Sequence, residues 1–248
     1  MAEKKENENK EEKTDTPRRK RGAANSAWEW AKSIAVAFVV WIFLRSLLIE
    51  AFRIPSGSME NTLLVGDFLF VNKALYGAEL PIIGARFPAI REPVTGDIVV
   101  FDSVEEENVN VVKRIVGSPA DTIDMRDNVL YRNGVRVDEP WVIITSAGSD
   151  TANARMRSWQ VRYLAGVDPR TYRPTQRNWG PIVVPRDSFF VMGDNRDNSY
   201  DSRYWGFLAR DRIKGRPLFV YYSFDKTGVL PLPAITGIRW GRLFSSPQ

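Results

Sequence analysis

From Ile54 onward the chain consists of short runs of β-branched and aromatic residues, bounded by Gly, Pro, Asp and Asn. The clearest runs read DFLFVNKALYG, GDIVVFDS, NVNVVKRIVG, NVLYRNGVRV and DSFFVMGD. Runs of this kind are typical of strands, and the Asn133-Gly134 pair between two of them is a strong hairpin signal. Helical periodicity is weak after residue 52. The pattern therefore predicts a mainly β ectodomain over residues 51–248, with short antiparallel strands in partly open, barrel-like sheets.

One part of this region does not fit the strand pattern. The stretch from about residue 140 to residue 181 is polar, with Arg, Trp and Pro and no clean alternation. It is predicted to be an insertion or a long loop region within the β domain.

The N-terminal part of the chain predicts a charged tail followed by a membrane anchor. Residues 1–26 are dense in charges of both signs and lack large apolar side chains, so they are expected to be disordered. Residues 27–50 hold an uninterrupted apolar core from Ile34 to Leu44. They reach the roughly 20 residues that a transmembrane α-helix needs if Lys32 and Arg45 extend toward the two interfaces.

Charge predicts the orientation of this anchor. A basic cluster at residues 18–21 precedes it, so the positive-inside rule places the tail in the cytoplasm and the β domain on the other side. A cleaved signal peptide and a buried core helix are the alternatives.

Composition limits the chemistry that the chain can perform. The sequence contains no Cys and no His, which excludes thiolate catalysis, Ser-His-Asp triads and His-ligated metal sites. Any acid–base catalyst must therefore be Lys, Asp, Glu or Tyr. The net charge of +5 suits an anionic membrane surface as well as nucleic acid and decides little by itself.

The segment Pro55-Ser56-Gly57-Ser58-Met59 places two hydroxyls beside a glycine, directly after the apolar segment. Ser58 could act as a nucleophile if a base removes its proton, and its own N–H could bind the developing oxyanion. Ser56, two residues earlier on the same face of an extended segment, could be a second donor. The alternative is an ordinary Pro-Ser-Gly-Ser turn in a loop.

Lys113 interrupts the alternating apolar run VNVVKRIVG and is followed by Arg114. Neighbouring residues on a strand face opposite sides, so Lys113 points inward if Arg114 faces solvent. Burial lowers a lysine pKa toward neutrality and leaves an amine that can act as a general base. The alternative is an edge strand with two solvated cations.

Residues 192–207 read MGDNRDNSYDSRYWGF and are dense in Asp, Asn, Arg and Ser. Such density predicts a hydrogen-bonded network closed by Asp–Arg pairs. A solvated loop and a calcium site are the alternatives, although the glycine and terminal Glu of an EF-hand loop are missing.

Together these segments resemble, in order and spacing, the conserved boxes of the type I signal peptidase family, also called leader peptidases. The matching segments are the N-terminal anchor, PSGSM followed by TLLVGDFLFVNKALYG, then GDIVVF, VKRIVG and GDNRDNSYDSRYWGF. The resemblance covers nearly the whole chain. It implies a membrane-bound serine endopeptidase with a Ser-Lys dyad, which removes N-terminal signal peptides from exported preproteins after small residues at −1 and −3.

The resemblance also implies a role for individual residues. It makes Ser58 the nucleophile and Lys113 the general base, while Ser56 supplies an oxyanion hydroxyl. Ser199 orients the lysine amine, and Asp201 and Arg203 form the charged pair that supports the site. Five positions match the apolar substrate pocket, namely Phe52, Ile54, Met59, Leu63 and Val112.

The setting of the enzyme follows from the same resemblance. A monomer is expected in the bacterial plasma membrane, with a single span, a cytoplasmic N-terminus and the catalytic domain on the outer face. No metal, cofactor or nucleic-acid partner is implied. The chain departs from the family at Ala120, where a glycine is usual and where positive φ is poorly tolerated.

Two other functions and two placements of the C-terminal segment are alternatives. A membrane-anchored β domain that binds secreted peptides without cleaving them is the alternative function. A self-cleaving Ser-Lys protease of the repressor type is less consistent, since that group carries a DNA-binding domain. The basic, amphipathic C-terminal segment 234–248 could touch the membrane interface or pack as a strand or helix on the domain.

Overall fold

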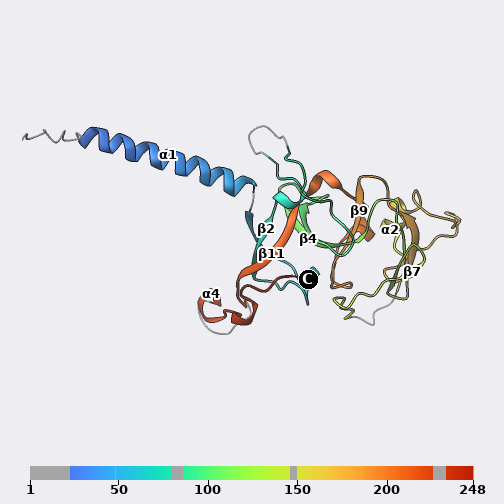
Figure 1. Ribbon diagram of the computed structural model, residues 1–248. Helices are drawn as coiled ribbons and strands as arrows, with labels where there is room; N and C mark the ends of the chain where they lie inside the picture. Colours follow the sequence, from blue (N-terminus) through green and yellow to red (C-terminus); the bar gives the residue numbers. More distant parts are fainter. Residues whose placement is uncertain (1–22, 48, 80–85, 146–149, 226–232, 248) are drawn as a thin grey trace, which may run out of the picture. The chain divides into compact units, whose positions relative to one another are not determined.

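The computed structural model describes residues 23–47, 49–79, 86–145, 150–225 and 233–247, so the predicted tail lies almost wholly outside the described residues. Contacts divide the chain into two units, residues 1–42 and 43–248. Helix α1, Ala23–Leu47, is a continuous helix of 25 residues (Figure 1). Its side chains from Ala27 to Ile42 are exposed. Within the described ranges, no helix combines the length and the apolar character that a membrane crossing requires.

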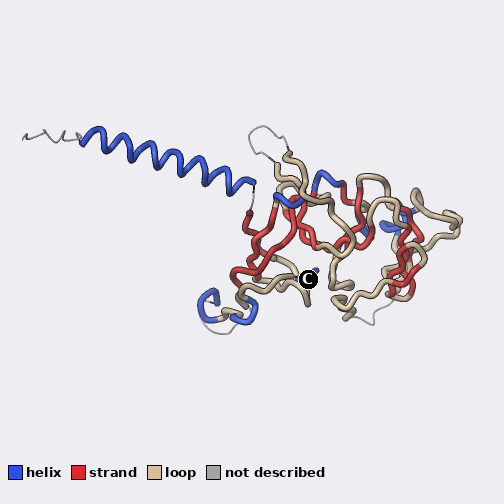
Figure 2. The backbone as a smooth tube through the Cα atoms, in the orientation of Figure 1, coloured by secondary structure: helices blue, strands red, loops and turns tan. Residues whose placement is uncertain are grey.

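The larger unit is built mainly from antiparallel strands, which confirms the mainly β prediction (Figure 2). A seven-stranded sheet has the order β1-β2-β11-β3-β4-β9-β10. Its strands are β1 (Ile49–Arg53), β2 (Asp67–Asn72), β11 (Ile213–Ser223), β3 (Ile98–Asp102), β4 (Asn110–Gly117), β9 (Ser188–Met192) and β10 (Leu208–Ala209). Strands from both ends of the sequence meet at its centre, because β11 pairs with β2 and with β3.

A second sheet of four strands has the order β7-β6-β5-β8. Its strands are β5 (Thr122–Arg126), β6 (Val129–Arg132), β7 (Val135–Arg136) and β8 (Trp179–Val183). The β6–β7 hairpin turns at Asn133 and Gly134, which have φ values of 53° and 78°. Positive φ at both central positions is what a tight two-residue hairpin requires, so the hairpin prediction is confirmed.

Short helices connect the strands. They are the α-helices α2 (Ala154–Gln160), α3 (Ser202–Trp205) and α4 (Pro233–Thr236), and the 3-10 helices η1 (Gly57–Met59), η2 (Ala74–Tyr76), η3 (Arg210–Arg212) and η4 (Trp240–Arg242). The region that was predicted as an insertion, residues 140–181, contains α2 and the start of β8. Met156 of α2 and Trp179 of β8 are both buried in the core beside the second sheet.

The seven-stranded sheet is covered on both faces at β3. Ile98 and Val100 belong to one apolar core, whereas Val99 and Phe101 belong to another. This alternation sends successive side chains to opposite faces. A continuous apolar run such as IVVF is therefore the signature of a strand that is covered on both sides.

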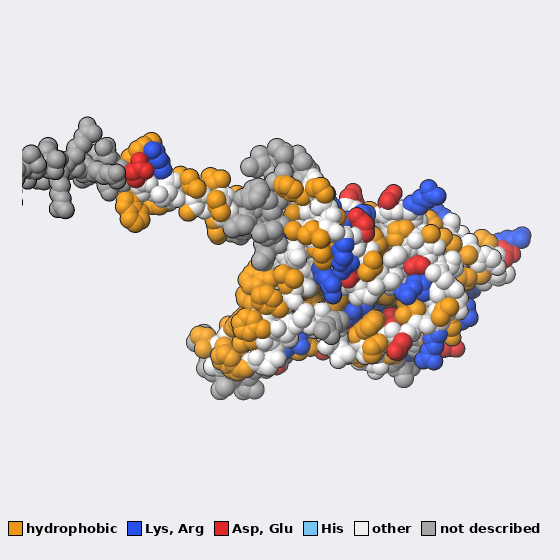
Figure 3. All heavy atoms as spheres, in the orientation of Figure 1, with side chains coloured by type: hydrophobic (Ala, Val, Ile, Leu, Met, Phe, Trp, Pro, Cys, Tyr) orange, Lys and Arg blue, Asp and Glu red, His pale blue; other side chains and the backbone are white. Residues whose placement is uncertain are grey.

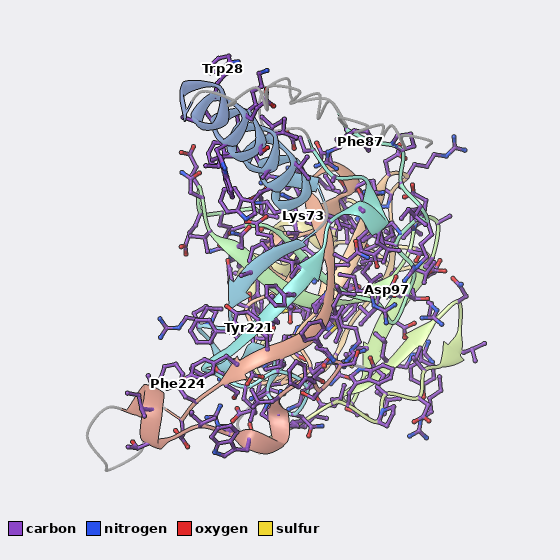
Figure 4. All side chains as sticks on the ribbon, turned by 60° about the vertical axis from the view of Figure 1, so that its left-hand side comes forward. Trp28, Lys73, Phe87, Asp97, Tyr221 and Phe224 are labelled. Carbon is purple, nitrogen blue, oxygen red and sulfur yellow. The ribbon has the colours of Figure 1, made fainter. Side chains whose placement is uncertain are left out.

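One outer part of this sheet carries aromatic side chains that are only partly buried. Phe70 stacks on Tyr221, with 4.3 Å between the ring centroids, and Phe68 stacks on Phe224. Figure 3 shows apolar side chains gathered where β2, β11 and α4 lie, and Figure 4 shows Tyr221 and Phe224 along the β11 side of this surface.

Candidate active site

Ser58 lies in the 3-10 turn η1 rather than on an extended segment. Ser56 precedes the turn with extended backbone angles (φ −126°, ψ 157°), and Glu60 N–H closes it on the Gly57 carbonyl. Ser58 is 8% exposed. Within the described ranges its N–H donates to no protein group. A free N–H at the start of a helical turn is available for an anionic ligand.

The two serine hydroxyls face each other. Ser56 Oγ lies 3.4 Å from Ser58 Oγ, and Ser56 is exposed while Ser58 is buried. A group bound at Ser58 Oγ would therefore have both the Ser58 N–H and the Ser56 hydroxyl close by. The prediction that the two share one face holds, although the backbone that brings them together is a turn.

Lys113 is on β4, opposite Val99 of β3, and its side chain is 3% exposed. Burial lowers the pKa of the Lys113 amine to about 8, because removal from water disfavours the charged form. Asp201 and Asp194 oppose this shift and Arg203 adds to it. Within the described part of the chain the amine forms no ion pair. The amine is thus buried without a direct counter-ion.

Gly193 brings the serine turn and the lysine strand together. Arg114 of β4 pairs with Met192 of β9, so the next residues along the two strands are Lys113 and Gly193. A Cβ atom at Gly193 would overlap both Ser199 Oγ and the Ser58 carbonyl oxygen. Ser58 and Ser199 therefore crowd the position beside Lys113. Sequence reasoning missed Gly193, whose only signal is a glycine between an apolar strand and an acidic segment.

The acidic segment, residues 194–203, follows β9 and folds into a buried hydrogen-bonded network around Asp201. Its carboxylate forms a bidentate ion pair with Arg203, at 2.8 and 2.9 Å, and accepts from Ser199 Oγ at 2.7 Å and from Gly193 N–H at 3.1 Å. The Arg203 guanidinium, more than any other partner, holds the pKa of Asp201 below its usual range against the effect of burial. Because Ser199 donates its proton to Asp201, its oxygen lone pairs remain available to accept from an amine.

The structure corrects the reasoning about Arg114. We expected Lys113 to be buried if Arg114 faced solvent, but Arg114 is itself buried. Its guanidinium binds the Asp194 carboxylate with contacts of 2.9 and 2.8 Å and lies over the Trp141 ring. Both faces of β4 are covered here, and the second cation is neutralised by a carboxylate that sequence reasoning did not assign to it. A solvated edge strand is therefore excluded.

A small apolar pocket lies next to Ser58. It has a volume of about 150 Å³ and is lined by residues 54–56, 58, 59 and 109–112. Three of the predicted pocket residues, Ile54, Met59 and Val112, line it. The other two, Phe52 and Leu63, are buried in the apolar core to which Ile54 and Met59 also belong. They support the wall of the pocket rather than its surface.

Ala120, the departure from the family pattern, adopts the left-handed conformation with φ of 70°. Its N–H donates to the Val184 carbonyl, and Asp121 closes the turn through bonds with Ser118. The turn therefore keeps a glycine-like geometry with an alanine in place.

The fold and this cluster define a β-sheet protein whose candidate reacting groups are a serine on a helical turn and a buried lysine. The model of the signal peptidase family, peptidase S26, matches residues 27–222, and the chain belongs to this family. The resemblance that the sequence suggested is thereby confirmed.

Individual relatives agree with this assignment. A signal peptidase I from Pseudomonas aeruginosa is 37% identical over 219 residues, which cover 83% of this chain and 76% of that protein. A signal peptidase I from Bacillus licheniformis is 33% identical, covering 82% of this chain and 92% of the relative. The signal peptidase I T of Bacillus subtilis is 32% identical, covering 87% and 96%.

Proposed function

We propose that this protein is a signal peptidase that cleaves signal peptides from exported preproteins, with Ser58 as nucleophile and Lys113 as general base. The observation that carries the proposal is the burial of Lys113, on a strand whose preceding residues line the pocket beside Ser58. An amine with a pKa of about 8 is partly neutral near pH 7 to 8, which suits a general base. Membership of the signal peptidase family supports the same conclusion.

The proposed reaction begins with a proton transfer between the two assigned residues. Neutral Lys113 accepts the Ser58 proton, and Ser58 Oγ attacks the carbonyl carbon of the −1 residue. The Ser58 N–H and the Ser56 hydroxyl stabilise the oxyanion. The lysine ammonium then protonates the leaving amine, and water deprotonated by Lys113 hydrolyses the acyl-enzyme. Ser199 orients the amine, while Asp201 and Arg203 fix Ser199.

Specificity for small residues is part of the proposal. The pocket beside Ser58 is apolar and walled by Ile54, Met59 and Val112, and we infer that these side chains restrict the −1 and −3 positions to small residues. Phe52 and Leu63 keep this wall rigid from behind.

We also propose that α1 anchors the enzyme in the bacterial plasma membrane as a single span, with a cytoplasmic N-terminus and a monomeric catalytic domain outside. The exposed apolar side chains from Val36 to Ile42 support this, as does the aromatic surface at Phe70 and Tyr221. Alkaline carbonate extraction of cell membranes tests the anchor. The protein should stay in the pellet, and complete release into the supernatant would contradict the proposal.

The catalytic assignment is tested by incubating the detergent-solubilised protein with a preprotein and measuring the cleavage site by mass spectrometry. Ser58→Ala should abolish cleavage, since it removes the nucleophile. Lys113→Arg should do the same, because a guanidinium cannot act as a neutral base. Ser158→Ala and Lys73→Arg make the same changes at residues outside the pocket lining, where Ser158 donates to the Arg155 carbonyl and Lys73 pairs with Glu50, so these controls should keep wild-type rates. Normal turnover by Ser58→Ala would refute the assignment.

A further inference from the structure

The carbonyl oxygen of Arg203 accepts two side-chain hydrogen bonds from α2. Trp159 Nε1 and Gln160 Nε2 each donate to it at 3.1 Å. Both donors come from the 140–181 region, to which neither the family resemblance nor the proposed reaction gives a role. Two donors on one carbonyl fix the position of the main chain that carries the Arg203 guanidinium.

Gln160 is itself held in one orientation. It is fully buried, and its Oε1 accepts from the Tyr172 hydroxyl. The Tyr172 oxygen in turn accepts from the Gly180 N–H of β8 at 2.8 Å. Because Tyr172 occupies the carbonyl side of the amide, the NH₂ side must face Arg203. A buried polar chain of this kind costs free energy if any member loses its partner.

The same chain continues from Arg203 into the active site. The Arg203 side chain holds Asp201 in two hydrogen bonds, and Asp201 accepts from Ser199 Oγ. Arg203 belongs to α3, which has only four residues and is capped by Asp201, so the helix supplies little rigidity of its own. Its position depends on what binds its backbone.

We propose that Gln160, Tyr172 and Trp159 are positioning residues of the active site. Through the Arg203 carbonyl they hold the Asp201 carboxylate against Ser199 and beside Lys113. The inference rests on the proposed roles of Ser58 and Lys113, and it gives the 140–181 region a function: it is the support on which the acidic segment is aligned.

A purely structural role must be distinguished from positioning. Met156 of α2 contributes to the apolar core, so large changes in this region would destabilise the domain whatever the polar chain does. Tyr172→Phe removes a single hydroxyl and keeps the ring. Trp159→Phe removes the second donor to the same carbonyl. Tyr163→Phe is the matched control, because within the described ranges the Tyr163 hydroxyl forms no hydrogen bond.

The test measures kcat, KM and the pH dependence of preprotein cleavage by the full-length protein. Tyr172→Phe and Trp159→Phe should each lower kcat about 5- to 20-fold with little change in KM, while Tyr163→Phe behaves as wild type. The charged groups that act on Lys113 are Asp201, Asp194 and Arg203, and Asp201 raises its pKa most. A displaced Asp201 should therefore move the acid limb of the profile to lower pH.

Each outcome decides between the possibilities. A wild-type kcat and acid limb in Tyr172→Phe, with Ser58→Ala inactive, would overturn the positioning role alone. The positioning role would also be overturned if the activity lost by Tyr172→Phe equals the unfolded fraction measured by circular dichroism and the acid limb of the pH profile does not move. Activity in Ser58→Ala would overturn the proposed function itself.

Discussion

At the scale of the residue, Lys113 combines two costs that a structural lysine would avoid. It is only 3% exposed, and within the described structure no carboxylate is bonded directly to its amine. The nearby Asp201 is instead paired with Arg203, whose charge offsets part of the effect of Asp201 on the amine. This arrangement lowers the pKa of the Lys113 amine toward neutral pH. It also lowers the free energy of unfolding, because a cation is buried without a bonded partner.

The pH dependence of both activity and stability follows from this pKa. Cleavage should rise with pH through about 8 as Lys113 becomes neutral. Between about pH 8 and the ordinary value of 10.5, the unfolded chain holds a proton that the folded lysine has lost. The free energy of unfolding should therefore increase with pH across this window, and the cost of burial is complete below it.

Lys113→Met tests that cost directly. The variant should be inactive and, at pH 7, more stable than wild type by roughly 1–3 kcal/mol, since an apolar side chain of similar length replaces a buried cation. Urea unfolding of both proteins at pH 7 and pH 10 measures it. The difference should shrink at pH 10, and a variant that is less stable at pH 7 would contradict the argument.

Sequence reasoning correctly predicted the burial of Lys113. With no histidine or cysteine in the chain, a serine nucleophile requires a base of another kind, and Lys113 stands in the middle of an apolar strand. It failed for Arg114, because strand alternation says that two neighbours face opposite sides but not that both sides are covered. The pairing of Arg114 with Asp194 joins residues 80 positions apart and leaves no local signal.

At the scale of the element, the turn from β9 into the acidic segment is the part that tolerates least change. Gly193 ends the strand, donates its N–H to Asp201 and leaves room for Ser58 and Ser199. The glycine is needed here for close approach, because its φ is not in the left-handed region.

Gly193→Ala should therefore separate the two serines from the lysine. The added methyl group overlaps the Ser199 hydroxyl and the Ser58 carbonyl, so the turn must move. We expect at least a 100-fold loss of kcat and a destabilisation of about 1–3 kcal/mol. Preprotein cleavage and urea unfolding measure these effects, with Gly241→Ala, where a Cβ meets nothing, as the control. Equal activity of the two variants would contradict the assigned crowding.

The strands could be predicted from their β-branched runs, and the β6–β7 hairpin from its Asn-Gly turn. The elements of the 140–181 region could not. Its core residues, such as Met156 and Trp179, are single apolar positions among many arginines, and their partners lie on other strands. The fold of this region is determined by packing and by the buried hydrogen bond between Tyr172 and Gln160. Neither gives the helical or strand periodicity of apolar residues from which an element can be predicted.

At the scale of the whole molecule, the C-terminal segment closes the centre of the large sheet. Strand β11 pairs with β3 only near its start, at Ile213 and Gly215. Further along, the same edge of β11 pairs with the C-terminal segment, where Phe244 N–H donates to the Val220 carbonyl and Arg239 N–H donates to the Ser223 carbonyl. The segment thus adds backbone pairing to the domain, while Trp240 and Phe244 stay exposed. The end of the chain supports a sheet whose first strand begins at Ile49.

Arg242 links this C-terminal segment to the loop that follows Ser58. Its guanidinium binds the fully buried Asp67 carboxylate, with contacts of 3.0 and 2.6 Å, and donates to the Thr62 carbonyl at 3.0 Å. Asp67 also accepts from Ser223 Oγ and from Leu64 N–H. The carboxylate therefore joins the loop, strand β11 and the C-terminal segment in one buried network.

Arg242→Met should leave Asp67 without its main counter-ion and destabilise the protein by about 3 kcal/mol, because a buried carboxylate that loses its partner keeps the cost of desolvation. Arg170→Met is the matched control, since its pair with Asp168 is exposed and should contribute less than about 1 kcal/mol. Urea unfolding of the two variants gives the comparison. Similar losses in both would show that the Asp67 network does not stabilise the sheet, and that the C-terminal segment holds the loop by backbone pairing alone.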